Sequence, residues 1–92
     1  MNFEAIRAEQ TGAVLQITLN RPEARNAMSL KMVGELRQAL AAAEASAGKD
    51  GAVRVVVVRG AGGHFCAGGD LKDMAGARMR AMQNTDAAQD PI

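Results

Sequence analysis

The chain has 92 residues, of which 48% are hydrophobic and only two, Phe3 and Phe65, are aromatic. This length suffices for one small domain, and a net charge of +1 from eleven basic and ten acidic residues gives no electrostatic case for a nucleic-acid or membrane partner. The sequence has no apolar run near the roughly 20 residues of a membrane helix, and its single cysteine cannot form an internal disulfide. We therefore expect a cytoplasmic protein with a small-molecule partner.

The first elements expected are two β-strands joined as a hairpin. Residues 3–8 form the first strand, and residues 13–19 alternate apolar and polar side chains as a half-buried strand does. Residues 10–12 supply the turn. Pro22 then breaks the pattern because it lacks a backbone donor, so a loop is expected over residues 20–28.

A helix and a third strand follow this loop. Ser29 is expected to cap the helix and Gly48 to end it. Residues 53–58 are apolar and mostly β-branched, which predicts a buried strand. A helix between two strands predicts a crossover that makes the strands parallel. Helical spacing predicts the core-facing stripe Leu30, Val33, Leu36, Leu40, Ala43 and Ala47.

A glycine-rich loop comes directly after the third strand. Five of the ten glycines lie between Gly60 and Gly69, and Asp70 suits the N-terminus of a short helix over residues 71–74. Taken alone, such a loop is more often a plain connection than a ligand site, and it does not match the G-x-x-x-x-G-K-[ST] nucleotide loop. Exposed N–H groups near a helix start nevertheless favour an anion or a developing oxyanion.

Two sequence segments resemble a known superfamily. Residues 65–74, FCAGGDLKDM, resemble the F-x-A-G-x-D-[LI]-x-x-[ML] segment of the enoyl-CoA hydratase/isomerase, or crotonase, superfamily, and residues 19–28, LNRPEARNAM, resemble its L-N-R-P-x-x-x-N-A-[LM] segment. The resemblance implies an α/β fold, the N-terminal part of the crotonase (ClpP-like) ββα spiral, with a hairpin, a helix, a buried parallel strand, the glycine-rich loop and a short helix. Residues 1–74 would form this part, and residues 75–92 a helical or disordered tail.

The resemblance also implies roles for individual residues. Crotonase-like enzymes bind acyl-CoA thioesters and stabilise a thioester enolate with two backbone N–H groups, and Gly69 matches the residue that provides one of them. Leu71 would lie beside the adenine, and Lys72 would attract a phosphate. Glu23 departs from members that carry a basic residue there, a loss for which Arg25 could compensate. The positions that match CoA-binding residues are Ala24, Arg25, Ala27, Ala67, Gly69, Asp70, Leu71 and Lys72.

The implied activity is that of a lyase or isomerase of fatty acid metabolism. The CoA thioester would be the substrate, with no separate cofactor and no metal, and complete members assemble as trimers or hexamers. The family's second glycine segment, G-x-A-x-G-G-G, and its catalytic carboxylates have no match after Gly69, so we expect the 92-residue chain alone to be inactive. The alternatives are a short non-catalytic protein for CoA binding or assembly and, more distantly, an α/β domain without a ligand.

Other chemistries have weaker support. His64 and Cys66 are too few for a zinc site, and we expect a solvent-facing His64 and a packed Cys66. Asp70 and Asp73 are more easily explained by the positive end of a helix than as an acid–base pair. Met74 is a weak candidate for an acyl pocket, since methionine more often fills cores.

Overall fold

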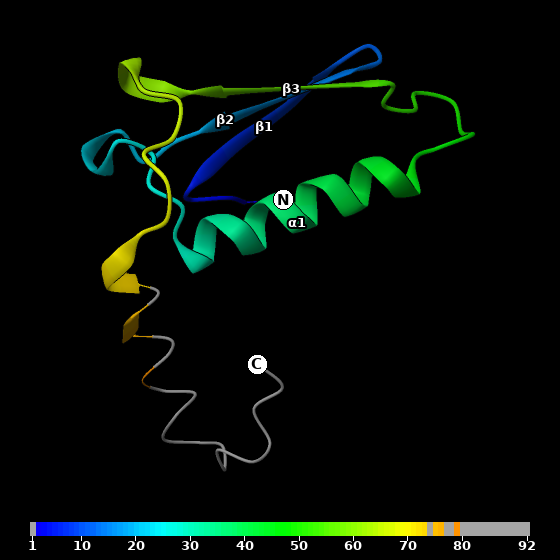
Figure 1. Cartoon of the computed structure of the whole chain (residues 1–92). Helices are drawn as coiled ribbons and strands as arrows, with labels where there is room; N and C mark the ends of the chain where they lie inside the picture. The colour runs from blue at the N-terminus through cyan, green and yellow to red at the C-terminus, as the bar shows by residue number, and fades with distance from the viewer. Residues whose placement is uncertain (1, 74, 77–78, 80–92) are drawn as a thin grey trace.

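The computed structural model describes residues 2–73, 75–76 and 79. Figure 1 shows a three-stranded sheet with one long helix lying along one of its faces. Within the described part of the chain, no helix is long and apolar enough to cross a membrane. The elements in chain order are β1 (Ile6–Thr11), β2 (Val14–Leu19), the 3-10 helix η1 (Pro22–Ala24), α1 (Leu30–Ala45), β3 (Val55–Gly60) and the 3-10 helix η2 (Ala61–Gly63).

The predicted hairpin is confirmed, with a shift in its first strand. β1 pairs with β2 in antiparallel fashion, with Ile6 opposite Leu19. The strand covers residues 6–11 rather than 3–8, so the predicted turn over residues 10–12 is also wrong. The turn falls on residues 12–13 because Gly12 adopts a φ of +59°, the left-handed conformation that tight hairpin turns require.

The predicted crossover is confirmed as well. β2 and β3 are parallel neighbours, with Ile17 opposite Val58, and the Ser29 Oγ caps α1 by accepting the Met32 N–H at 3.1 Å. The predicted helix end at Gly48 is wrong, because α1 ends at Ala45. Ser46 closes the helix instead, since its hydroxyl donates to the Ala43 carbonyl and accepts the Val53 N–H.

The face of α1 that turns to the sheet matches the predicted stripe only in part, since Leu36 and Ala43 pack against the core as predicted. Met32, Glu35 and Ala39 are buried, whereas Leu30 and Leu40, both expected to face the core, are 44% and 45% exposed. The prediction followed apolar side chains only. The helix is instead rotated so that a carboxylate faces β1.

This carboxylate belongs to Glu35, which fixes the helix to the start of the hairpin. Its two oxygens accept the N–H groups of Glu4, Ala5 and Ile6, the shortest of these bonds being 2.8 Å from Ala5. Burial raises the pKa of Glu35, but the three N–H donors outweigh it and the net pKa is lowered. The residue therefore stays charged and satisfied inside the fold.

The core lies between α1 and the hairpin. Alternation along β2 turns Leu15, Ile17 and Leu19 toward the helix, where each is less than a tenth exposed. Thr18 is also buried, on the same strand. The full cluster of buried apolar residues is Ala5, Ile6, Leu15, Ile17, Leu19, Met32 and Ala39.

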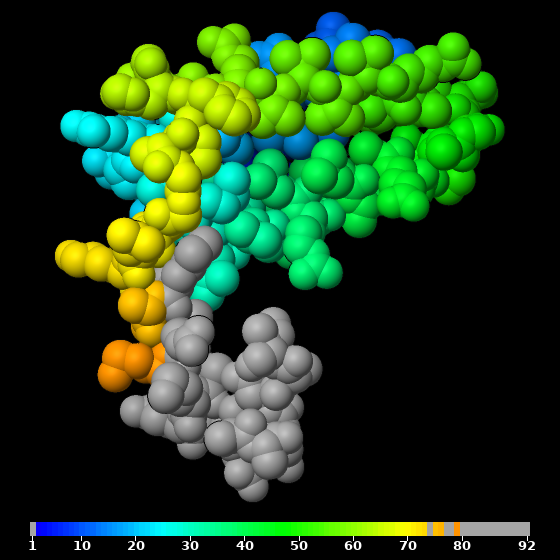
Figure 2. All heavy atoms as spheres, in the orientation of Figure 1, coloured from blue at the N-terminus to red at the C-terminus, as the bar shows by residue number. Residues whose placement is uncertain are grey.

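The prediction that the third strand is buried is wrong for this chain. The four valines of β3, residues 55–58, are 40–50% exposed. The reason is topological, since β3 is the last strand of the order β1-β2-β3 and α1 packs over the other two strands. Figure 2 shows the atoms of β3, in light green, along the upper rim of the molecule.

Candidate functional site

The proline-containing loop after β2 and the glycine-rich loop after β3 lie side by side. Their backbones are joined by three hydrogen bonds, from the Ala67 N–H to the Arg25 carbonyl at 3.1 Å, from the Met28 N–H to the Gly68 carbonyl at 2.7 Å, and from the Asp70 N–H to the Met28 carbonyl at 3.0 Å. The last two form a parallel bridge between Met28 and Gly69. We call residues 20–28 and 60–70 together the loop corner.

Asn26 lies at the centre of the loop corner and is fully buried. Its Oδ1 accepts the Arg21 N–H at 2.8 Å, and its Nδ2 donates to the carbonyls of Ala61 at 2.9 Å and His64 at 2.7 Å. Its φ is +58°, a conformation that asparagine tolerates better than most residues. One side chain therefore joins the first loop to both ends of η2.

Arg21 is the second polar residue that bridges the two loops. Its guanidinium donates to the Ala27 carbonyl at 2.6 Å and to the Asp70 carboxylate at 3.1 Å. Asp70 also accepts the Asp73 N–H at 3.1 Å, as the predicted cap of the helical turn that begins at residue 71. The Asp73 N–H and then Arg21 lower the pKa of Asp70, so it is a carboxylate at neutral pH.

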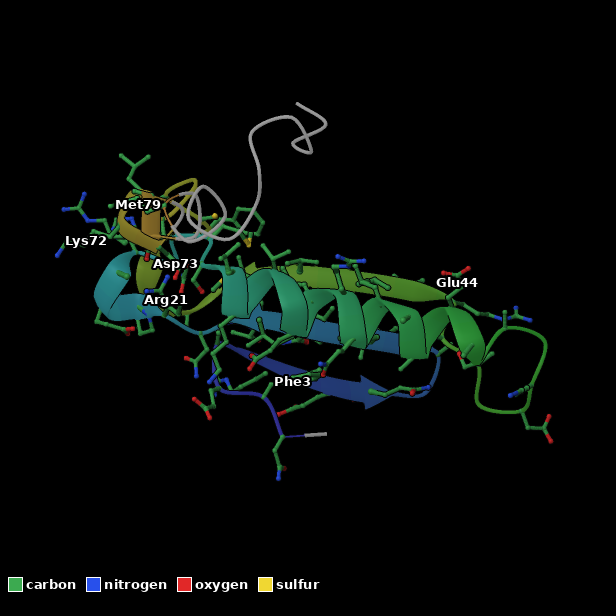
Figure 3. All side chains as sticks on the ribbon, turned by 90° about the horizontal axis from the view of Figure 1, so that it is seen from below. Phe3, Arg21, Glu44, Lys72, Asp73 and Met79 are labelled. Carbon is green, nitrogen blue, oxygen red and sulfur yellow. The ribbon has the colours of Figure 1, made fainter. Side chains whose placement is uncertain are left out.

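Asp73 has a structural partner of its own. Its carboxylate accepts the Leu30 N–H, the first N–H of α1. Figure 3 shows Asp73 and Arg21 at the same end of α1, with Glu44 near the other end. Both aspartates are therefore engaged at helix starts, which agrees with the expected helix-terminus role rather than with an acid–base pair.

Two glycines allow the loops to approach closely. A Cβ at Gly60 would lie 2.1 Å from the His64 carbonyl oxygen, and a Cβ at Gly62 would lie 2.6 Å from the Pro22 Cβ. Gly62 also has a φ of +77°. A larger residue at Gly62 would push the glycine-rich loop away from Pro22, whereas a larger residue at Gly60 would disrupt the fold of the glycine-rich loop upon itself.

The peptide between Gly68 and Gly69 presents an N–H group outward. The Gly68 carbonyl accepts the Met28 N–H, and in a planar trans peptide the N–H of the next residue points the opposite way. Gly69 is exposed, and its N–H has no hydrogen-bond partner among the residues that the structure describes. The Gly69 N–H is thus a free donor whose direction is defined by the bridge to Met28.

The remaining residues predicted to bind CoA lie around this donor. Ala24 and Ala27 are half-buried, and Arg25 and Ala67 are exposed, on the two paired loops. Leu71, which is 82% exposed, and the exposed Lys72 lie on the helical turn after Asp70. The structure therefore brings the two predicted sets together at one corner. Met74, the acyl-pocket candidate, lies outside the described residues.

Arg21 and Asn26 are the site residues to which the sequence assigned no role. Both lie in the segment LNRPEARNAM, but only its CoA-matching positions received one. The only sequence feature that pointed to Asn26 was its place before an alanine in a loop that contains a proline. That signal does not identify a partner, because the carbonyls that Asn26 binds lie 35 and 38 residues further along the chain.

His64 and Cys66 do not form a reactive pair in this arrangement. His64 is exposed and Cys66 is half-buried against the core, as expected. The Cys66 thiol lies 3.8 Å from the Gly68 carbonyl oxygen. Within the described ranges no three His, Cys, Asp or Glu side chains are placed to hold a metal ion.

The strand order and the paired loops are those expected for the N-terminal region of the crotonase fold. Solved structures with the same fold support this assignment. Pseudomonas aeruginosa AtuE is 59% identical, with a TM-score of 0.74 over 87% of this chain and 30% of that one. An enoyl-CoA hydratase/isomerase from Marinobacter aquaeolei is 54% identical, with a TM-score of 0.70 over 80% of this chain and 26% of that one. These likenesses confirm the predicted fold class.

The sequence comparisons identify the family. The family model described as enoyl-CoA hydratase/isomerase matches residues 9–90 of the chain. The chain therefore belongs to this family. A Rhizobium meliloti protein named "Probable enoyl-CoA hydratase" is 42% identical over 76 residues, which cover 83% of this chain and 28% of that protein. The chain thus spans less than a third of the length of these relatives.

Proposed function

We propose that this chain supplies the acyl-CoA-binding N-terminal part of an enoyl-CoA hydratase/isomerase. In this proposal the Gly69 N–H donates to the thioester oxygen and stabilises the negative charge that develops there. A donor whose direction is fixed in advance stabilises such charge without reorganising during the reaction. The observation that carries the proposal is the free, outward Gly69 N–H beside the Gly68 carbonyl that Met28 holds.

The surroundings of Gly69 suit the rest of an acyl-CoA molecule. Arg25, on the proline-containing loop, and Lys72, on the helical turn after the glycine-rich loop, are exposed cations, and cations of this kind attract phosphate groups. Leu71 offers an apolar side chain, 82% exposed, that an adenine could cover. We propose contacts from the backbone of Ala24, Ala27, Ala67, Gly69 and Asp70 to the remaining parts of CoA.

The loop corner supports polarisation of the thioester rather than a complete reaction. Hydration needs an acid–base group near the reacting carbon, but the two carboxylates closest in sequence to Gly69 are engaged at helix starts. We propose that this group belongs to a longer enzyme, a cytoplasmic trimer or hexamer, and that the 92-residue chain alone gives no multiple turnovers of crotonyl-CoA. A non-catalytic CoA-binding protein would use the same corner.

Amide NMR with two matched ligands tests the role of Gly69. Free CoA and butyryl-CoA share the adenine, phosphates and pantetheine, and only butyryl-CoA has a thioester carbonyl. We expect both ligands to shift the Arg25 and Lys72 amides of the labelled chain, and only butyryl-CoA to shift the Gly69 amide strongly. Gly12, in the hairpin turn at residues 12–13, is the internal control. A Gly69 amide that ignores saturating butyryl-CoA would contradict the proposal.

A further inference from the structure

The Arg21–Asp70 ion pair spans the loop corner next to Gly69. We propose that it is a positioning device, which holds the Gly68–Gly69 peptide so that the Gly69 N–H keeps its outward direction. The inference rests on the proposed function for its catalytic meaning. The mechanical part depends only on the contacts within the corner.

The peptide that carries the Gly69 N–H needs an external restraint. It lies between two glycines, and Gly68 has a φ of +102°, so neither neighbour offers a Cβ that would resist rotation of this peptide. The restraint that the structure shows is the Met28 backbone, which binds the Gly68 carbonyl on one side and the Asp70 N–H on the other. Loss of these two bonds would leave the peptide free to turn over.

Arg21 keeps the two strands of this bridge together. One guanidinium nitrogen donates to the Ala27 carbonyl, immediately before Met28, and the other contacts the Asp70 carboxylate, immediately after Gly69. The guanidinium fork therefore joins the residue before one bridge partner to the residue after the other. A lysine has no planar fork and cannot make both contacts with the same fixed geometry.

Partial burial of the Arg21–Asp70 ion pair suits it to holding the Gly68–Gly69 peptide in one orientation. The Arg21 and Asp70 side chains are 23% and 19% exposed, so the pair is shielded more than the Lys31–Glu4 pair, whose side chains are 54% and 77% exposed. Exposed ion pairs stabilise proteins little. The contacts of Arg21 and Asp70 lie within the loop corner and the helical turn that follows it, so we expect removal of the pair to alter the loop corner locally, while the sheet and α1 stay folded.

Hydrogen exchange and NMR on the full 92-residue chain test the proposal. In Arg21→Gln we expect exchange of the Met28 and Asp70 amides to rise at least about tenfold relative to the wild type, with the β2 amides unchanged. We also expect the butyryl-CoA shift of the Gly69 amide to be lost. Asp70→Asn should act in the same direction, because its side-chain oxygen still caps Asp73 but has no charge for Arg21.

Two further variants guard against a trivial result. Lys31→Gln removes an ion pair of the same type elsewhere on the surface and should change neither readout. Arg21→Lys retains the charge and should lie between the wild type and Arg21→Gln, and it replaces Arg21→Gln if that variant does not fold.

The outcomes separate the two proposals. Unchanged exchange at Met28 and Asp70 in folded Arg21 and Asp70 variants would overturn the positioning role, as would a Gly69 shift with butyryl-CoA equal to that of the wild type. If exchange rises as expected but the wild-type Gly69 amide never responds to butyryl-CoA, the mechanical role is supported and the proposed function fails.

Discussion

The glycine-rich part of the loop corner directly follows β3 in the chain, yet the corner and β3 are held in opposite ways. At the corner, a buried asparagine joins the two loops through hydrogen bonds to backbone carbonyls, and a half-buried ion pair joins them through the side chains of Arg21 and Asp70. Along β3, four consecutive valines are 40–50% exposed at the edge of the sheet. The polar, glycine-rich segment is the closely fitted one, and the most apolar segment is the open one.

This difference shows that apolar composition does not decide where a segment is buried. A valine loses its exposure only if another element covers it, and α1 covers β1 and β2. Asn26, by contrast, must be buried where its partners are, because an unpaired buried amide or carbonyl costs about 1–3 kcal/mol. Three predictions, at Gly60, Glu35 and Val58, test this contrast in decreasing order of the expected loss of stability.

Gly60, where β3 meets the loop corner, should be the most sensitive position. We expect Gly60→Ala to lower the free energy of unfolding by about 3 kcal/mol or more, because the new Cβ would lie 2.1 Å from the His64 carbonyl oxygen, and backbone atoms cannot move aside cheaply. Urea unfolding followed by circular dichroism measures this effect.

Gly34, in the middle of α1, is the matched control for this substitution. A Cβ there meets nothing within 4 Å, so Gly34→Ala should raise the free energy of unfolding by about 0.5–1 kcal/mol through helix propensity. Equal effects of the two substitutions would contradict the close fit at the corner.

Glu35 tests whether polar anchoring extends beyond the corner. We expect Glu35→Gln to cost about 2 kcal/mol near neutral pH, because a neutral amide replaces a carboxylate that accepts three backbone N–H groups. Urea unfolding at neutral pH, with Glu44→Gln on the exposed part of the same helix as a near-neutral control, measures this cost.

The pH dependence of Glu35 has a defined sign. Its pKa in the folded chain lies below the ordinary value of 4.5, so the unfolded chain takes up the proton first. Its contribution is therefore complete above the unfolded pKa and is lost as the pH falls through the folded pKa. We expect the stability gap between wild type and Glu35→Gln to shrink over this acid range, and a gap independent of pH would contradict a charged anchor.

Val58 and Ile17 face each other in the parallel register of β3 and β2, and they give the finest comparison. Val58 is 41% exposed and Ile17 is fully buried. We expect Val58→Ala to cost less than about 1 kcal/mol and Ile17→Ala about 3 kcal/mol, since the second leaves a cavity in the core. If urea unfolding gives equal costs, β3 is covered in solution, and the contrast between the two regions disappears.

The two motif segments predicted more of the candidate site than the pattern of apolar residues predicted of the fold. The segments LNRPEARNAM and FCAGGDLKDM contain the predicted CoA-binding positions, and the structure pairs Arg25 and Met28 with residues 67–70. Hydrophobic spacing predicted α1 itself but only part of its core-facing side, because Glu35 contributes to that side as a buried carboxylate. Spacing rules count only apolar side chains. They therefore do not detect a buried carboxylate whose N–H donors lie in a distant segment of the chain.

Local sequence was enough to predict the hairpin, the Ser29 cap, the order of elements and the family, because each depends on local conformational preference or on residues that are adjacent in the chain. The folded chain was needed to show that β3 is an open edge, that Glu35 faces β1, and that Asn26 and Arg21 join two loops. Each of these depends on a partner that lies distant in the sequence. Burial and hydrogen bonding between such partners are properties of the packed chain, and local sequence does not encode them individually.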